Sequence, residues 1–439
     1  MKALNHAKLF LARKRKLTAA LAAAALAGFS LIGQPCFGQV PSKRPTDDSN
    51  SSAETTDDVG AVGFDLQWFG PSTTYVYGLN PAGQVRQVVR EKAPSSARSP
   101  VKAASNDEAM SQASAQQVSQ GAARQAPPST TDYFPPGQLQ AKIANLFGNL
   151  PGRKAVKFSS PGVGTAPGLL AVLNGQQRLF SASANKVFIL CERLRQLDSP
   201  NVTNQLGAHE LQLDKNVWSL GSTVFNPPAL SGLVSEKTTM EAMIVHSDNT
   251  ATDMILKEAG PNRVRQFIGG VGLPNTLIPD STRALFAYVQ GALNYLTISW
   301  DESLSLLDRS AVHPLLNDIE TLASSANDLV SFYERALQGG FFRNQETLTE
   351  FRRILALGDI NYLVGFPLGV NAFGKAGYFD STGTHGRCIA GGMFTANRWV
   401  YFAAIINWDA ASPTDPATEA AFYDALRKAI AAVQTELAR

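Results

Sequence analysis

The sequence has little cysteine, histidine and charge for its length, and each shortage excludes a class of protein. Three cysteines in 439 residues cannot form the framework of a disulfide-stabilised small domain. Five histidines without acidic or thiol partners at ligand spacing predict no metal site, and we expect no other cofactor. Charged residues make up only 17% of the chain, but a hydrophobic content of 44% excludes a wholly disordered protein. The length suits two or three domains.

The surplus of positive charge lies entirely at the N-terminus. The first 38 residues contain no Asp or Glu, and their six cations are Lys2, Lys8, Arg13, Lys14, Arg15 and Lys16. Removal of this segment changes the formal net charge from +3 to −3. A chain with that balance lacks the basic surplus that binds phosphate backbones, so we expect no nucleic-acid partner.

The N-terminus also has the order of a secretory signal peptide. A basic stretch, 2–16, precedes an apolar run, 17–33, and the small residues Cys36 and Gly38 define a cleavage site before Gln39. A retained anchor is the alternative, because the run just reaches the length of a membrane span; its weakly apolar Ala and Gly content favours cleavage. We therefore predict a signal peptide over 1–38, a secreted or periplasmic protein, and no stable membrane span after cleavage.

Residues 39–134 are predicted to be a disordered, low-complexity linker. The stretch 93–129 is rich in Ala, Ser, Gln and Pro, and it has too few large apolar side chains to offset the entropy of ordering. The stretch 62–90 differs, because alternating apolar residues flank Asn80-Pro-Ala-Gly83 and predict a small β-hairpin. A unit of that size is not stable alone, so we expect it to dock on the main domain or on a protein partner of unknown identity.

Residues 135–439 are predicted to form one discontinuous α/β (α+β) domain. Strands are expected at 155–160 and 169–173 near its start and at 400–408 near its end, where Asp415-Pro416 opens a terminal helix. Between these ends, about 183–363 has mostly helical spacing. The pattern predicts a sheet flanked by helices, with an all-helical insert.

A serine and a lysine lie one helical turn apart at the start of a predicted helix. Ser183 and Lys186 precede apolar residues at helical spacing, which are Val187, Leu190, Cys191, Leu194 and Leu197. A desolvated lysine can take the proton of a serine hydroxyl and make it a nucleophile. The pattern is weak alone, because Ser99-Pro-Val-Lys102 also fits it and a helix cap followed by a solvated lysine explains it equally.

Two further polar segments offer groups to a shared cleft. Thr238 and Glu241 predict a capping box for a helix, and Ser247-Asp248-Asn249 follows that helix at a corner. This triplet supplies a hydroxyl and an amide, with an ordinary Asx turn as the alternative. Near the C-terminus, Lys375-Ala376-Gly377 on an edge strand supplies a cation and an accessible backbone, with a plain strand end as the alternative.

The three motifs together, in this order, resemble one known active site. Ser183-x-x-Lys186, Ser247-Asp248-Asn249 and Lys375-Ala376-Gly377 make the chain similar to the serine β-lactamase and penicillin-binding protein superfamily, and most similar to class A β-lactamases. The resemblance runs from about residue 139 to the C-terminus and does not cover 39–134. It implies a β-lactamase/transpeptidase-like fold, with an antiparallel sheet flanked by helices and an all-helical subdomain.

The resemblance also implies a role for each matched residue. Ser183 would be the acylated nucleophile, with Lys186 as its base or part of its proton relay. Ser247 would pass the proton to the leaving nitrogen, and Asn249 would hold Lys186 and the substrate amide. Lys375 would attract a substrate carboxylate and help to keep Lys186 neutral. The implied oxyanion hole is formed by the backbone N–H groups of Ser183 and Tyr378, and the implied substrate-binding residues are Gly377 and Arg387.

Two departures from the class A pattern affect turnover and binding. Class A enzymes carry an Ω-loop glutamate that activates the deacylating water, whereas the stretch 277–288 here has Asp280 as its only carboxylate. Asp280 is the candidate for the deacylation base, and an ordinary turn aspartate is the alternative. Ala376 stands where the family usually has Thr or Ser, which removes one donor to the substrate carboxylate, worth about 1 kcal/mol.

The sequence therefore predicts an exported serine hydrolase that opens β-lactam amides through an acyl-enzyme at Ser183 and deacylates slowly. The expected partner is a β-lactam or a peptidoglycan-derived small molecule. A D,D-peptidase or esterase on the same fold, or a non-catalytic cell-wall-binding protein, are the alternatives. Cys191 and Cys388 could pair in an oxidising compartment, although buried packing is favoured for both.

Overall fold

The computed structural model describes residues 74–79, 85–90, 137–307, 309–367 and 370–438. The predicted signal peptide, most of the predicted linker and most of 62–90 lie outside these residues. The chain divides into two units, 1–119 and 120–439. In the first unit, strands β1 (Thr74–Leu79) and β2 (Val85–Arg90) pair antiparallel, with Leu79 opposite Val85.

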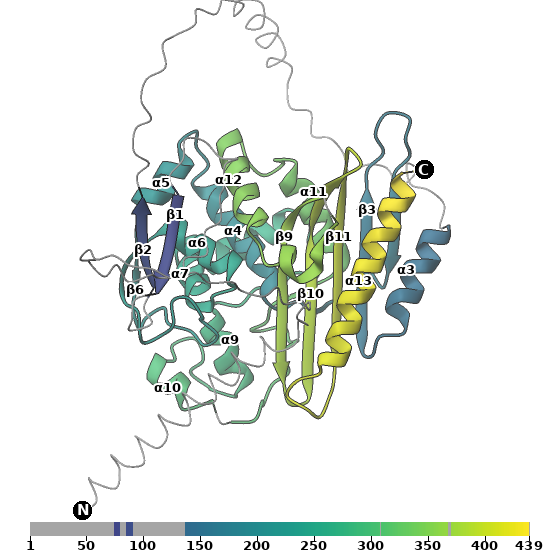
Figure 1. Cartoon of the computed structure of the whole chain (residues 1–439). Coiled ribbons are helices and arrows are strands. Elements are labelled where there is room, and N and C mark those ends of the chain that lie inside the picture. Colours follow the sequence, from purple (N-terminus) through teal and green to yellow (C-terminus); the bar gives the residue numbers. More distant parts are fainter. Residues whose placement is uncertain (1–73, 80–84, 91–136, 308, 368–369, 439) are drawn as a thin grey trace, which may run out of the picture. The chain divides into compact units, whose positions relative to one another are not determined.

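A five-stranded antiparallel sheet forms the centre of the second unit, in the order β4-β3-β11-β10-β9 (Figure 1). The N-terminal strands are β3 (Arg153–Ser160) and β4 (Leu169–Leu173). They pair with the C-terminal strands through β11 (Arg398–Trp408), which is followed in the sheet by β10 (Thr384–Thr395) and by β9 (Asn371–Ser381) at the edge. The sheet thus joins the two ends of the domain.

Helices cover both faces of this sheet (Figure 1). α3 (Gln138–Gly148) and α13 (Pro416–Leu437) pack on one face and against each other. Most of the segment between β4 and β9 supplies the other face, whereas Ile360 and Val364 near its end pack on the α13 side. The segment is largely helical, although two short strand pairs interrupt it. Its elements are β5 (Leu179–Phe180), η2 (Ala182–Asn185), α4 (Lys186–Gln196), α5 (Val202–Ala208), β6 (Glu210–Leu213), β7 (Gly232–Ser235), α6 (Glu236–Val245), α7 (Asn249–Ala259), α8 (Pro261–Gly270), α9 (Thr282–Val289), α10 (Trp300–Leu304), β8 (Ala323–Ser324), α11 (Ala326–Leu337), α12 (Gln345–Ala356) and the π-helical turn η3 (Asn361–Gly365).

The sheet separates two hydrophobic cores. Because neighbouring residues of a strand face opposite sides, β10 contributes Cys388 and Ala390 to the core on the α4 side and Ile389 to the core under α13. Cys191 lies in the same core as Cys388, and both thiols are buried and free. The arrangement confirms the predicted fold class, an antiparallel sheet flanked by helices. The subdomain predicted to be all-helical is largely helical, because the strand pairs β5/β8 and β6/β7 lie within it.

Helix caps explain where the flanking helices begin. Asp415 caps α13 by accepting a hydrogen bond from the Thr418 N–H, with a proline in the first turn, as the sequence indicates. The capping box predicted at Thr238 is wrong, because α6 begins earlier and Ser235 is its cap. Within the described parts of the chain, no helix has the length and hydrophobicity to cross a bilayer.

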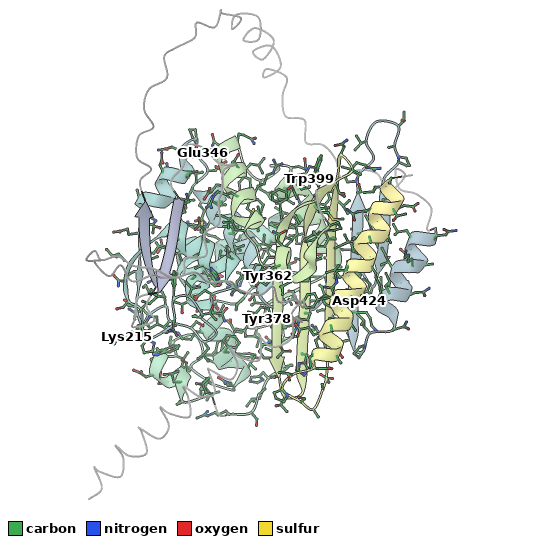
Figure 2. The ribbon with its side chains drawn as sticks, viewed as in Figure 1. Lys215, Glu346, Tyr362, Tyr378, Trp399 and Asp424 are labelled. Atoms are coloured by element: carbon green, nitrogen blue, oxygen red, sulfur yellow. The ribbon has the colours of Figure 1, made fainter. Side chains whose placement is uncertain are left out.

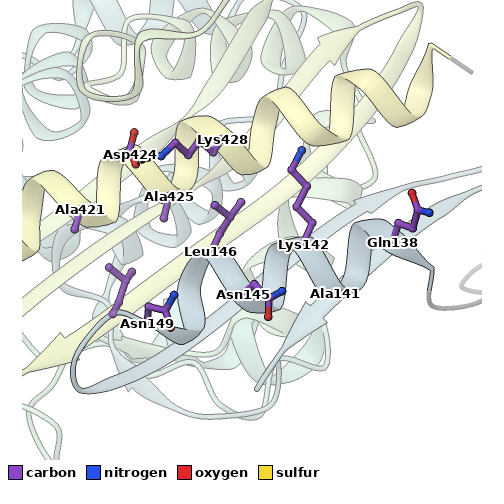
Figure 3. A pocket seen from close by; sticks show the side chains of 11 residues that line it. Gln138, Ala141, Lys142, Asn145, Leu146, Asn149, Ala421, Asp424, Ala425 and Lys428 are labelled. Carbon is purple, nitrogen blue, oxygen red and sulfur yellow. Dashed lines mark ion pairs between the residues drawn. The ribbon is translucent and has the colours of Figure 1, made fainter.

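A surface groove of about 730 Å³ lies between α3 and α13, on the side of the sheet that these helices cover (Figure 3). Leu146 and Ala425 contribute apolar surface to it, and Lys428 pairs with Asp424 at its rim with 2.7 Å between the charged atoms. The groove is separated from the three sequence motifs by the sheet itself.

Candidate active site

Ser183 lies at the start of a firmly held helix. Ala182 before it has φ of +48°, a left-handed conformation that side chains disfavour and that turns the chain from β5 into η2. The side-chain amide of Asn185 donates to the carbonyls of Leu277 (2.9 Å) and Ala323 (2.8 Å). These two hydrogen bonds hold η2 in place. Ser183 is half-buried, and its hydroxyl has no hydrogen-bond partner among the described residues.

Lys186 is the first residue of α4 and is 0% exposed. Its Nζ donates to the carbonyl of Ser247 and to the side-chain oxygen of Asn249 at 2.8 Å, and it lies 3.3 Å from the Ser247 hydroxyl. Burial, assisted by the charge of Lys375, lowers the pKa of Lys186 to about 7. A large fraction of this amine is therefore neutral at pH 7 and able to accept a proton.

The Ser-Asp-Asn corner is held by contacts that aim two of its side chains at Lys186. Ser247 has φ of +55°, a strained conformation between the end of α6 and the start of α7. Asp248 turns away from Lys186: it caps α7 through the Ala251 N–H at 2.9 Å and accepts two backbone N–H groups of 224–225. The Asn249 amide nitrogen donates to the Leu220 carbonyl at 2.7 Å, so its oxygen faces Lys186.

Lys375 and Gly377 lie on β9 and face the same side of the sheet. Lys375 is 0% exposed, and its ammonium pairs with the carboxylate of Asp359, which is also buried. A Cβ at Gly377 would stand 2.2 Å from the Ser181 carbonyl oxygen and 3.0 Å from the Ser183 nitrogen. Only glycine permits this approach, which brings the third motif against the first.

Tyr378 follows at the free edge of β9. The Ala376 N–H points off this edge, because it donates to Asp359 at 2.8 Å. Since alternate N–H groups of a strand point the same way, the Tyr378 N–H also points off the edge. Tyr378, which is labelled in Figure 2, is exposed, with 53% of the residue accessible to solvent. The two backbone groups predicted to form the oxyanion hole thus come from adjoining stretches, 181–184 and 377–378.

Arg387 lies outside the site, contrary to the prediction. It stands opposite Tyr378 in the ladder, on the α13 face of the sheet, whereas Lys375 and Gly377 face the other side. Its guanidinium is buried and pairs with Asp380 at 2.8 Å and Glu419 at 3.0 Å. Burial alone would lower the pKa of Arg387, but the hydrogen bonds and charges of Glu419 and Asp380 outweigh it and raise the pKa above its ordinary value. The guanidinium is therefore bound by carboxylates of the fold itself.

Asp280 contacts Arg265 and Glu320, which lie outside the three motifs. Leu277 and Ala323 exchange backbone hydrogen bonds and close a long loop, residues 278–322, which we call the Ω segment. Within it, the Asp280 carboxylate accepts from Arg265 of α8 at 2.9 Å, and the Asp280 N–H donates to the buried Glu320 carboxyl at 2.9 Å. Asp280 therefore joins the Ω segment to α8 and is not brought to the nucleophile.

Thr282 is the residue through which the Ω segment contacts the site, and no sequence motif indicated it. Its hydroxyl donates to Asp253 at 2.8 Å and lies 3.3 Å from the Asn249 carbonyl. Asp253 is one helical turn beyond Asn249, and it also accepts the N–H groups of Thr282 and Arg283. Burial raises the pKa of Asp253 to about 6. The spacing from Asn249 is a helical signal that points to Asp253.

The comparisons with known proteins identify a family and a shared fold. The sequence profile described as the β-lactamase enzyme family matches residues 138–429. No curated protein matches the chain by sequence. Among solved structures, PBP-A is 18% identical with a TM-score of 0.50, over 69% of this chain and 98% of that one. A β-lactamase from Chitinophaga pinensis DSM 2588 is 13% identical with a TM-score of 0.53, over 68% and 99%. The TLA-3 extended-spectrum β-lactamase is 14% identical with a TM-score of 0.53, over 69% and 98%.

At these identities the solved structures show a shared fold, and the family is shown by the profile. The profile spans all three motifs, and the fold brings the backbone of 181–184 against Gly377 and the buried amine of Lys186 against Ser247 and Asn249. We conclude that the chain is a serine hydrolase-type protein that belongs to the β-lactamase enzyme family.

Proposed function

We propose that the chain is an exported enzyme that opens β-lactam amides through an acyl-enzyme at Ser183 and releases the product slowly. The neutral amine of Lys186 takes the proton of Ser183 as the hydroxyl attacks the carbonyl carbon. The N–H groups of Ser183 and Tyr378 stabilise the oxyanion, with donors of this kind each worth about 3 kcal/mol. Ser247, 3.3 Å from the amine, passes the proton to the leaving nitrogen.

The observation that carries this proposal is the buried amine of Lys186. It follows Ser183 by one helical turn, its pKa is about 7, and Asn249 and Ser247 fix its direction. A buried lysine that is half neutral at working pH is unfavourable for stability and suited to proton transfer. A structural role does not require this combination beside a serine whose hydroxyl has no hydrogen-bond partner in the described part of the chain.

Slow release of the acyl group is expected from the side chains that the Ω segment places near the site. The carboxylates whose charge raises the pKa of Lys186 are Asp248, Asp253 and Asp359, and none of them belongs to the Ω segment. Asp280 is paired with Arg265, and the Ω-segment group that contacts Asn249 in the described residues is the Thr282 hydroxyl, at 3.3 Å from the Asn249 carbonyl. A hydroxyl is a much weaker base for water than a carboxylate, so the acyl-enzyme is expected to persist.

Intact mass spectrometry with benzylpenicillin tests the proposal. We expect a penicilloyl adduct that is lost by Ser183→Ala and retained by Ser99→Ala, the other serine in a Ser-x-x-Lys pattern. Adduct that decays over minutes or longer, unchanged by Asp280→Ala, supports slow release. Absence of a Ser183-dependent adduct contradicts the nucleophile, and rapid turnover contradicts the account of deacylation.

Export is tested separately by the mass of the mature protein. Cleavage before Gln39 in a secreting host supports a secreted or periplasmic location, and a retained N-terminus contradicts it.

Two other functions are distinguished by substrate. Turnover of a chromogenic ester or a D-Ala-D-Ala peptide without β-lactam acylation indicates an esterase or D,D-peptidase, and muropeptide binding without any label indicates a cell-wall-binding protein.

A further inference from the structure

One carboxylate of the chain accepts from two donors on β9. Asp359, in the turn between α12 and η3, accepts from the Lys375 ammonium through Oδ2 and from the Ala376 N–H through Oδ1 at 2.8 Å. These two donors come from the motif that the family resemblance assigned to a substrate carboxylate. A bidentate arrangement of this kind is what an incoming carboxylate would itself adopt.

The ion pair of Lys375 and Asp359 is buried, and the turn that carries Asp359 packs tightly on β9. Lys375 is 0% exposed and Asp359 is 1% exposed. The turn is also pressed against β9, since a Cβ at Gly358 would lie 2.3 Å from the Gly374 carbonyl oxygen, and Ile360 packs on Gly374 from the same turn. Breaking a buried ion pair leaves a desolvated charge without a partner, so a substrate carboxylate has little chance of displacing Asp359.

The other groups expected to bind a carboxylate are also absent from this place. Ala376 has no hydroxyl, and Arg387 is paired on the opposite face of the sheet. His246 lies close enough to Lys375 and Asp359 to interact with their charges. Partial desolvation, with a further contribution from Lys375, lowers the pKa of His246 and so disfavours its charged form.

From these contacts we propose that Asp359 takes the place of a substrate carboxylate, and that the site prefers acyl donors with no carboxylate beside the scissile bond. The inference rests on the proposed function, because it names the substrate class of the same site. Neutral β-lactams, carboxyl-esterified β-lactams and uncharged activated esters belong to this class. A penicillin with a free carboxylate meets a site whose cation is already neutralised.

Benzylpenicillin and its methyl ester provide a matched pair for the test, because they share the reacting amide and differ in the charge of one group. The acylation rate of Ser183 in the wild-type chain is measured for both by intact mass at pH 7.5. We expect the ester to react at least as fast as the free acid. A preference of about tenfold or more for the free acid, the size of a charge-assisted hydrogen bond, overturns the inference.

A variant then tests the assignment to Asp359. Asp359→Asn removes the internal carboxylate, and the ratio of free-acid to ester acylation should rise about tenfold or more. Asp424→Asn on the far helix α13 is the control and should leave the ratio unchanged. An unchanged ratio in a folded Asp359→Asn protein contradicts the assignment. If that variant does not fold, the wild-type ratio still decides whether a carboxylate is recognised.

The proposed function and this inference fail in different ways. If neither compound labels Ser183, the proposed function is wrong, and calorimetric binding of both to Ser183→Ala protein decides the inference. Equal or tighter binding of the ester supports it, and binding of the free acid about tenfold tighter overturns it. If Ser183 is labelled but strongly prefers the free acid, the inference is wrong and the proposed function still holds.

Discussion

The amine of Lys186 lies 2.8 Å from the side-chain oxygen of Asn249, and the other end of that amide is anchored on the Leu220 carbonyl. The amide can therefore present only its oxygen to the amine. A neutral acceptor holds Lys186 in place without adding the negative charge that would keep it protonated, which is what a general base near neutral pH requires.

Asn249→Asp should move the pH dependence of acylation to higher pH. A carboxylate at this distance stabilises the Lys186 ammonium and raises its pKa by about one unit or more. The neutral fraction of Lys186 at pH 7, and with it the acylation rate, then falls about fivefold or more and recovers at higher pH. Rates between pH 5 and 10 check this, with Asn145→Asp on the exposed face of α3 as the control. An unshifted profile contradicts the role of the amide.

Lys186→Met should reduce acylation by about 10²- to 10⁴-fold, the contribution of a positioned general base. In the wild-type chain the rate should fall as pH decreases through about 7, because protonation removes the base. Lys157→Met is a matched control, since burial also lowers the pKa of Lys157, which lies on β3 away from the site. A loss of similar size in both variants would indicate a structural effect.

Gly377→Ala should impair both the fold and the reaction. The added methyl would stand 2.2 Å from the Ser181 carbonyl oxygen, so β9 or η2 must move. Overpacking of this kind costs about 1–3 kcal/mol, and displaced oxyanion donors reduce acylation about 100-fold. Gly270→Ala in α8 is the control, because its methyl would contact nothing within 4 Å. Wild-type rates in Gly377→Ala would show that the close approach has no role.

Glu320→Gln should remove a pH dependence of stability. Burial, with a further effect of Asp280, raises the pKa of Glu320 from 4.5 to about 8 in the folded chain. Because the folded pKa is the higher one, the protonated carboxyl stabilises fully below about 4.5, and this stabilisation is lost as pH rises through 8. Melting temperatures between pH 5 and 9 should fall for the wild type more than for Glu320→Gln. Parallel curves would contradict the buried proton.

Local sequence patterns predicted the fold class and the residues whose chemistry depends on spacing. Ser183 and Lys186 lie on one helix, and strand and glycine signals placed Lys375 and Gly377 on an edge strand, as the structure shows. Arg387 was misplaced because the side of a sheet that a residue faces depends on strand register, which a single sequence does not reveal. The pairing of Asp280 with Arg265 of α8 could not be predicted, because it is a tertiary contact that leaves no local sequence pattern.

Asp359 gives no local signal at all. It is brought to Lys375 by the packing of Gly358 on Gly374, a contact between two backbones that leaves no pattern in the intervening residues. Thr282 is similar, since it becomes visible only when the Ω segment closes over Asn249. Both depend on tertiary packing between segments, and that packing is the part of the site that motif spacing cannot supply.

The position of β11 has a consequence for biogenesis. This strand follows the other four strands of the described sheet in the sequence, yet it joins β3 to β10 and bridges the early and late strands of that sheet. Until residue 408 has emerged, β3 lacks a neighbour on one side, and so does β10. Unpaired edges of this kind recruit other chains, so a nascent or truncated polypeptide that stops before β11 should depend on chaperones and be degraded quickly.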